Sequence, residues 1–224
     1  MRRAAPIAVA GLLLAVIIAA GASAESHGAE RYDADIASSH VTIEGSSTLH
    51  GWRVEGQQFG GYLIVQENEL ASLWNSTSSA HPLAPTVHVE IPVASLKSGK
   101  RGMDDKISEA LKAKRHPTIA YRLESAEIKT RQTTQVDDCD GSRPIDTNGV
   151  LTVAGAERTV NIPMQVRCLS KNRLEVSGGT SLRMTDFGID PPTAMLGMVR
   201  TGDTVHVHWT WVLAKSRTDN RDEP

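Results

Sequence analysis

TVHVHWTWVL, residues 204–213, shows most directly how this chain folds. Apolar residues occupy every second position of this stretch, and polar residues fill most of the positions between them. Successive side chains of a β-strand point to opposite faces, so the alternation predicts a strand with one buried and one solvated face. The buried face would carry Val205, Val207, Trp209, Trp211 and Leu213, and the solvated face would carry His206, His208 and Thr210.

The same period of two recurs along most of the chain. It is clear in residues 86–93, 118–124 and 160–167, and weaker in residues 39–45, 49–56, 59–67, 148–154 and 172–185. About eight antiparallel strands with one apolar face must bury that face in a sandwich or in a closed barrel. Closure removes exposed strand edges, and an eight-stranded barrel is either filled by side chains or holds one slender ligand. The pattern therefore predicts an all-β domain.

One segment has the spacing of a helix instead. Met103, Ile107 and Leu111 fall on one side of a helix over about residues 103–114. His116-Pro117 ends it, because proline disfavours the helical conformation of the residue before it. We expect this to be the only helix of the mature chain.

The first residues have the pattern of a secretory signal. A basic start, Met1-Arg2-Arg3, precedes an apolar run over residues 4–20 and small residues up to Ala24. The run is shorter than the ~20 apolar residues of a membrane-spanning helix. We therefore expect a signal peptide at residues 1–24 with cleavage after Ala24, and a periplasmic or secreted protein.

The remaining chain is expected to form a single barrel domain over residues 25–214. Residues 68–85 and 133–147 are polar and turn-rich, so we interpret both as loops. Residues 215–224 have the composition of a disordered tail. The sequence contains no recognisable internal repeat.

The two cysteines fit an exported chain. Cys139 lies in a polar loop and Cys168 at the end of a strand-like run. Disulfides form and persist outside the reducing cytosol, so we expect a Cys139–Cys168 disulfide, with two free thiols as the alternative.

Charge and hydropathy limit the partners. The chain has 24 lysine and arginine residues against 26 aspartate and glutamate residues, and removal of the signal would take away two arginines and no acids. A mildly acidic chain argues against a nucleic-acid partner. No segment after the signal is long and apolar enough for a permanent membrane span. The sequence leaves the oligomeric state open, a homodimer included.

Four segments resemble, in order, the YceI-like family of exported barrels. They are GSSTLHGW (45–52), IPVASLKSG with the helix and ALKAKRHPTI (91–119), GVLTVAG (149–155) and MTDFGIDPP (184–192). The resemblance covers about residues 30–214, and the sequence around Ser38-Ser39-His40 indicates a divergent branch. Membership implies a single antiparallel lipocalin-like barrel that holds a long isoprenoid chain, such as a polyprenyl lipid or an isoprenoid quinone, with no established catalysis and no cofactor.

The residues agree with an apolar ligand. The inward positions are mostly valine, isoleucine, leucine and methionine, which suit a flexible hydrocarbon better than a flat ring. We expect an exported binding protein that holds a long apolar lipid for transport, storage or stress protection. The alternative is that the same side chains fill the barrel, leaving a solid-core interaction or structural protein without a ligand.

The candidate ligand-binding residues lie on the apolar faces or near a barrel end. Trp209 and Trp211 either line a tunnel or belong to the core, and Phe187 is expected to plug one end. His50 shares a face with Trp52 and either contacts a ligand head group or makes a structural polar contact. The full set is His50, Trp52, Val89, Ile91, Ile119, Tyr121, Ile162, Met164, Met184, Phe187, Trp209 and Trp211.

Metal binding and catalysis are less well supported. His206 and His208 have chelating spacing, but no acidic or cysteine ligand pattern accompanies them, so two solvated histidines are favoured. Ser46, His50 and Asp186 are residue types that hydrolases use, but the chain has no G-x-S-x-G motif. We therefore expect a binding protein rather than an enzyme.

Overall fold

The computed structural model describes residues 28–75, 81–129, 141–194, 196 and 198–216. The predicted signal peptide lies outside these residues. So do Cys139, and with it the disulfide to Cys168, and residues 217–224 of the expected tail, whereas Lys215, expected in that tail, is the last residue of β13. All three stay predictions.

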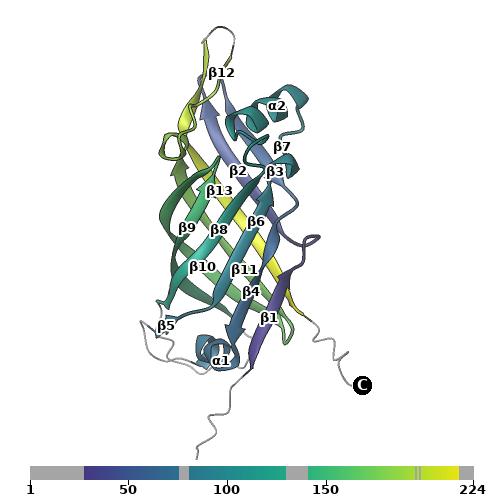
Figure 1. Ribbon diagram of the computed structural model, residues 1–224, viewed down its shortest axis with the longest axis vertical. Helices are drawn as coiled ribbons and strands as arrows, with labels where there is room; N and C mark the ends of the chain where they lie inside the picture. The colour runs from purple at the N-terminus through teal and green to yellow at the C-terminus, as the bar shows by residue number, and fades with distance from the viewer. Residues whose placement is uncertain (1–27, 76–80, 130–140, 195, 197, 217–224) are drawn as a thin grey trace, which may run out of the picture.

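Eight antiparallel strands close into a barrel (Figure 1). Each strand pairs with the next one around the barrel, and the last pairs back to the first. They are β1 (Ala29–Ala34), β4 (Gly60–Gln66), β6 (Thr86–Pro92), β8 (Thr118–Ile128), β9 (Ser142–Val153), β10 (Ala156–Ser170), β11 (Arg173–Arg183) and β13 (Val199–Lys215). The predicted all-β barrel is confirmed.

Further strands extend the wall outside the closed ring of eight strands. β13 pairs with β1 near its end and with β2 (His40–Ser47) over most of its length. β2 pairs with β3 (Gly51–Gly56), which in turn pairs with β7 (Leu96–Lys97). β5 (His81–Leu83) pairs with β8, and β12 (Thr193–Ala194) pairs with the start of β13. The long β13 therefore pairs with β1 and β11 of the closed ring and also with β2 and β12 outside it.

Two α-helices lie at opposite ends of the barrel (Figure 1). α2 (Arg101–Ala110) is the predicted helix, which begins slightly earlier than expected and gives way to a turn at Leu111. One-turn 3₁₀ helices, η1 (Val93–Ser95) and η2 (Met184–Phe187), join strands at the α2 end.

The expectation of a loop over residues 68–85 was wrong. α1 (Glu67–Asn75) and β5 occupy part of this segment, so α2 is not the only helix. Leu70, Leu73 and Trp74 have helical spacing, and Leu73 and Trp74 are buried. These apolar residues pack on the barrel end, and this burial stabilises a helix in an otherwise polar segment.

The second expected loop, over residues 133–147, also needs correction. Residues 142–147 belong to β9, and residues 133–140 lie outside the described ranges. Arg143, Ile145 and Thr147 are the buried positions of this part of β9. Two of these three side chains are polar, which hid the alternation.

Candidate functional site: an apolar cavity in the barrel

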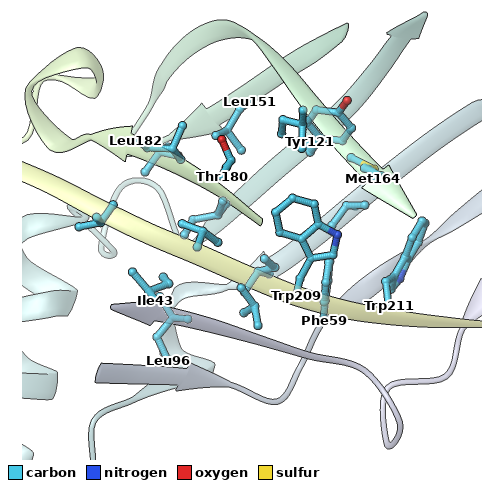
Figure 2. Close-up of a pocket in the computed structure, with 18 of the residues that line it drawn as sticks. Ile43, Phe59, Leu96, Tyr121, Leu151, Met164, Thr180, Leu182, Trp209 and Trp211 are labelled. Atoms are coloured by element: carbon cyan, nitrogen blue, oxygen red, sulfur yellow. The ribbon is translucent and has the colours of Figure 1, made fainter. Parts of the chain in front are cut away.

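The barrel is hollow. A cavity of about 430 Å³ runs between the strands, a volume within the usual range of small-molecule sites. Ile43, Leu151, Val207 and Trp209 line this cavity but are only partly buried, although the strand alternation points them inward. Figure 2 shows Ile43, Leu151 and Trp209 among the residues around it. A side-chain-filled interior would have buried them fully.

The structure brings all twelve candidate residues to the wall of this one cavity. They come from β3 and the turn before it, β6, β8, β10, η2 and β13. The wall contains His50, Trp52, Val89, Ile91, Ile119, Tyr121, Ile162, Met164, Met184, Phe187, Trp209 and Trp211. Contact of these residues with a ligand stays a prediction.

Aromatic rings lie against glycines of the neighbouring strand. Trp209 pairs with Gly178, and a Cβ atom added to Gly178 would lie 2.6 Å from Trp209 Cζ2. Trp52 pairs with Gly45, where an added Cβ would lie 2.2 Å from the Trp52 ring. The missing side chains let both indoles lie against the wall, which leaves the lumen open for a ligand.

The polar groups deep in the wall form a neutral chain. The Tyr121 hydroxyl donates to Thr147 Oγ1 (3.2 Å), which donates to the carbonyl oxygen of Ile162 (2.8 Å). Burial raises the pKa of Tyr121, so its hydroxyl stays protonated at neutral pH. These groups are satisfied within the wall and need no polar ligand atom.

Trp211 is different. It stacks on Phe59 with ring centroids 6.0 Å apart, and its buried Nε1 has no hydrogen-bond partner among the described residues. An acceptor atom on a ligand would satisfy this N–H, which otherwise costs free energy.

α2 covers one end of the cavity. Met103, Ile107 and Leu111 from α2 and the turn after it line the cavity there. The hydroxyl and backbone N–H of Ser98 donate to Asp104 Oδ1 at 2.6 and 2.7 Å, which fixes the start of α2. These hydrogen bonds hold the pKa of Asp104 below its usual range.

The exposed polar residues of the wall at this end define what we call the mouth. They are His50, Lys106, Arg183 and Thr193. Lys106 donates to the backbone oxygen of Thr193, and Arg183 forms a salt bridge to Asp186. The charged side chains of the wall at the mouth are therefore cationic, whereas the cavity behind it is apolar.

α1 closes the opposite end. Arg143 is 2% exposed and points from β9 to the last turn of α1. Its Nε donates to the carbonyl oxygen of Leu73 (3.2 Å), and one Nη donates to that of Trp74 (3.1 Å). A cation at a helix C-terminus is favourable, and these bonds attach α1 to the barrel wall.

The geometry does not support the other chemistries weighed from the sequence. His206 and His208 are exposed, and no group of three metal-ligating side chains occurs within the described residues. Asp186 pairs with Arg183, and His50 Nδ1 lies 2.7 Å from the backbone oxygen of Gly51. Across the described residues, no helix is long and apolar enough to span a membrane.

Sequence reasoning missed several residues of the wall. Alternation within their strands could have identified Leu151 and Leu182. Phe59 lies in the link between β3 and β4 but keeps the period of two with Leu63 and Val65, so alternation could have identified it as well. Thr147 is polar, so no hydropathy signal marks it.

A closed eight-stranded antiparallel barrel with an apolar cavity belongs to the class of small barrels with a lipocalin-like architecture. The YceI-like domain model matches residues 32–213, so the chain belongs to the YceI-like family. No curated protein matches the chain significantly.

Solved structures share this fold at low identity. BcnA from Burkholderia cenocepacia is 16% identical with a TM-score of 0.59, covering 80% of this chain and 99% of its own. A polyisoprenoid-binding domain from Saccharophagus degradans is 12% identical with a TM-score of 0.61, covering 83% and 98%. The YceI protein of Campylobacter jejuni is 15% identical with a TM-score of 0.51, covering 73% and 84%. At these identities the likeness concerns the fold alone.

Proposed function

We propose that this protein holds one long apolar lipid of the isoprenoid type, a polyprenyl lipid or an isoprenoid quinone, in the barrel cavity. The observation that carries the proposal is the hollow, almost wholly apolar interior, in which the deep Tyr121–Thr147 pair is neutral. The Saccharophagus degradans structure of the same fold, described as a polyisoprenoid-binding domain, supports this ligand class.

Chain length would supply the affinity. Each buried methylene contributes about 0.8 kcal/mol, so a five-carbon isoprene unit contributes roughly 3–4 kcal/mol. Association and ordering cost about 4–15 kcal/mol, which a few such units offset. A ligand of this kind needs few polar contacts.

We further propose that the protein works outside the cytoplasm, as a soluble periplasmic or secreted binding protein. The signal-like residues 1–24 support export, and the cysteines Cys139 and Cys168 suit an oxidising compartment. A long isoprenoid crosses an aqueous compartment only when its apolar surface is shielded from water. Transport or storage of such a lipid therefore suits a protein in the periplasm or outside the cell.

The test is to fill the cavity. Val207 faces the cavity from β13, whereas its neighbour His206 is exposed on the outer face of the same strand. We expect the wild-type protein and His206→Trp to bind a long-chain polyprenol in native mass spectrometry, and Val207→Trp to lose at least tenfold in occupancy. Near-ultraviolet circular dichroism checks that both variants fold.

Two outcomes would overturn the proposal. One is a wild-type protein that releases no lipid on organic extraction and takes up no polyprenol. The other is equal occupancy in Val207→Trp and His206→Trp. The solid-core alternative predicts instead that Val207→Trp fails to fold, because a filled interior has no room for the larger side chain.

A further inference from the structure

The most exposed large apolar side chains lie at the mouth end of the barrel. Leu49 is 68% exposed, Leu196 is 104% exposed and Met198 is 71% exposed. Among the residues that the structure describes, the other exposed large apolar side chains are Ile36 (51%) and Leu169 (40%), which are less exposed and lie in other parts of the fold. The exposed apolar surface is therefore unevenly distributed.

Two hydrogen bonds from Thr48 join the β2–β3 turn to the start of β13. The N–H of Thr48 donates to the Arg200 oxygen (3.0 Å), and the Thr48 hydroxyl donates to the Met198 oxygen (3.3 Å). Leu49 follows Thr48 in the β2–β3 turn, and Leu196 lies between β12 and β13. Figure 1 shows β12, β2 and β3 at the same end as α2. We call Leu49, Leu196 and Met198 the apolar tip.

The neighbouring residues 97–115, which run from β7 through α2 to the turn after it and which we call the α2 segment, are rich in basic residues. Residues 97–115 contain seven lysines and arginines against three aspartates and glutamates, although acidic residues outnumber basic ones in the whole chain. None of the seven cations forms a salt bridge among the described residues, and Lys106 and Lys112 donate only to backbone oxygens. The apolar tip is therefore bordered by an excess of positive charge.

We infer that the apolar tip and the α2 segment dock on the surface of an anionic phospholipid bilayer. Apolar side chains that enter the interface, bordered by lysine and arginine near the head groups, are the pattern of peripheral membrane binding. Protein interfaces instead bury a contiguous core and are depleted in lysine.

Docking in this orientation would turn the mouth toward the bilayer. A long apolar ligand would then pass between membrane and cavity without crossing water. This functional interpretation rests on the proposed function, whereas the docking itself depends only on the surface residues.

Vesicle co-sedimentation tests the docking. The protein for this experiment is expressed in a host that exports and processes it. Intact-mass spectrometry then identifies its N-terminus. We expect it to bind vesicles that contain phosphatidylglycerol, to bind pure phosphatidylcholine vesicles much more weakly, and to dissociate as salt is raised. Leu49→Asp and Met198→Asp should each weaken binding about tenfold or more, because each removes one inserted apolar group.

The matched controls place the same change on exposed apolar residues elsewhere. Ile36→Asp and Leu169→Asp should bind the vesicles as the wild type does. All variants share one N-terminus, so any contribution from that segment cancels. Melting temperatures establish that the four variants fold equally well.

Either of two results would overturn the docking: no vesicle binding by the wild type, or equal losses in the tip and control variants. Capture of a protein partner without vesicle binding would also count against it. Native mass spectrometry of the same samples separates the two proposals. Lipid in the cavity without vesicle binding removes only the docking, and vesicle binding by a protein that takes up no lipid removes only the proposed function.

Discussion

At the scale of single residues, the lumen depends on where side chains are missing. Gly178 has no positive φ, so its role is the space that it leaves for the Trp209 ring. Alternation in the sequence identified Trp209 as an inward residue. It could not identify Gly178 as its counterpart, because that contact depends on the register between β11 and β13.

We predict that Gly178→Ala destabilises the protein by about 1–3 kcal/mol, because the added Cβ forces the Trp209 ring off the wall. Its expected contact at 2.6 Å from Trp209 Cζ2 is too short to accept without movement of the ring. Urea denaturation measures the change in the free energy of unfolding, and tryptophan fluorescence reports the displaced ring.

Gly102→Ala is the matched control. A Cβ added there meets nothing within 4 Å, and Gly102 lies within α2. Alanine is the better helix former by up to about 1 kcal/mol, so this variant should be neutral or more stable. Similar losses in both variants would show that close packing at Gly178 is not the cause.

At the scale of elements, the period of two predicted most strands, and the apolar spacing of Met103 and Ile107 predicted α2. The same reasoning failed for α1, whose apolar residues are few and which is stabilised by tertiary contact. Its main anchor, Arg143, is a charged residue at an inward position of β9. Hydropathy assigns such a residue to the surface, so only the fold shows what it does.

We predict that Arg143→Met loosens α1 and lowers the free energy of unfolding by about 2–4 kcal/mol. The methionine fills similar space, but the carbonyl oxygens of Leu73 and Trp74 lose buried, charge-assisted hydrogen bonds. Urea denaturation measures the loss. Acrylamide quenching of tryptophan fluorescence, compared with a Trp74→Phe version of each protein, measures the exposure of the helix.

Arg122→Met is the control for charge removal. Arg122 is on β8 with a side chain 62% exposed, and it pairs with Glu124 at 3.5 Å. Exposed pairs contribute little, so the change should stay within about 0.5 kcal/mol. Equal losses of stability in Arg143→Met and Arg122→Met would refute the role of the Arg143 hydrogen bonds in holding α1 on the barrel.

At the scale of the whole molecule, the closure of the barrel and its hollow interior depend on different features of the sequence. Eight amphipathic strands required a closed or layered fold, and the family resemblance selected the barrel. Whether the interior was filled depended on how the glycines, indoles and helices pack across strands. No local pattern records this, so the sequence alone left the filled and hollow barrels open.

A hollow apolar barrel should be less stable when it is empty. A ligand that binds only the folded state stabilises it by about 2.7 kcal/mol when present at a hundred times its dissociation constant. For a domain of this size that corresponds to a rise in melting temperature of roughly 5–10 °C. We therefore expect organic extraction followed by refolding to lower the melting temperature by this amount, and added polyprenol to restore it.

The cavity-filled variant makes this measurement specific. Val207→Trp should melt at one temperature with or without polyprenol, because its indole occupies the space of the ligand, whereas His206→Trp should respond as the wild type does. A polyprenol that raised all three melting temperatures equally would be acting at the outer surface. The cavity would then not be the site that couples lipid binding to the stability of the barrel.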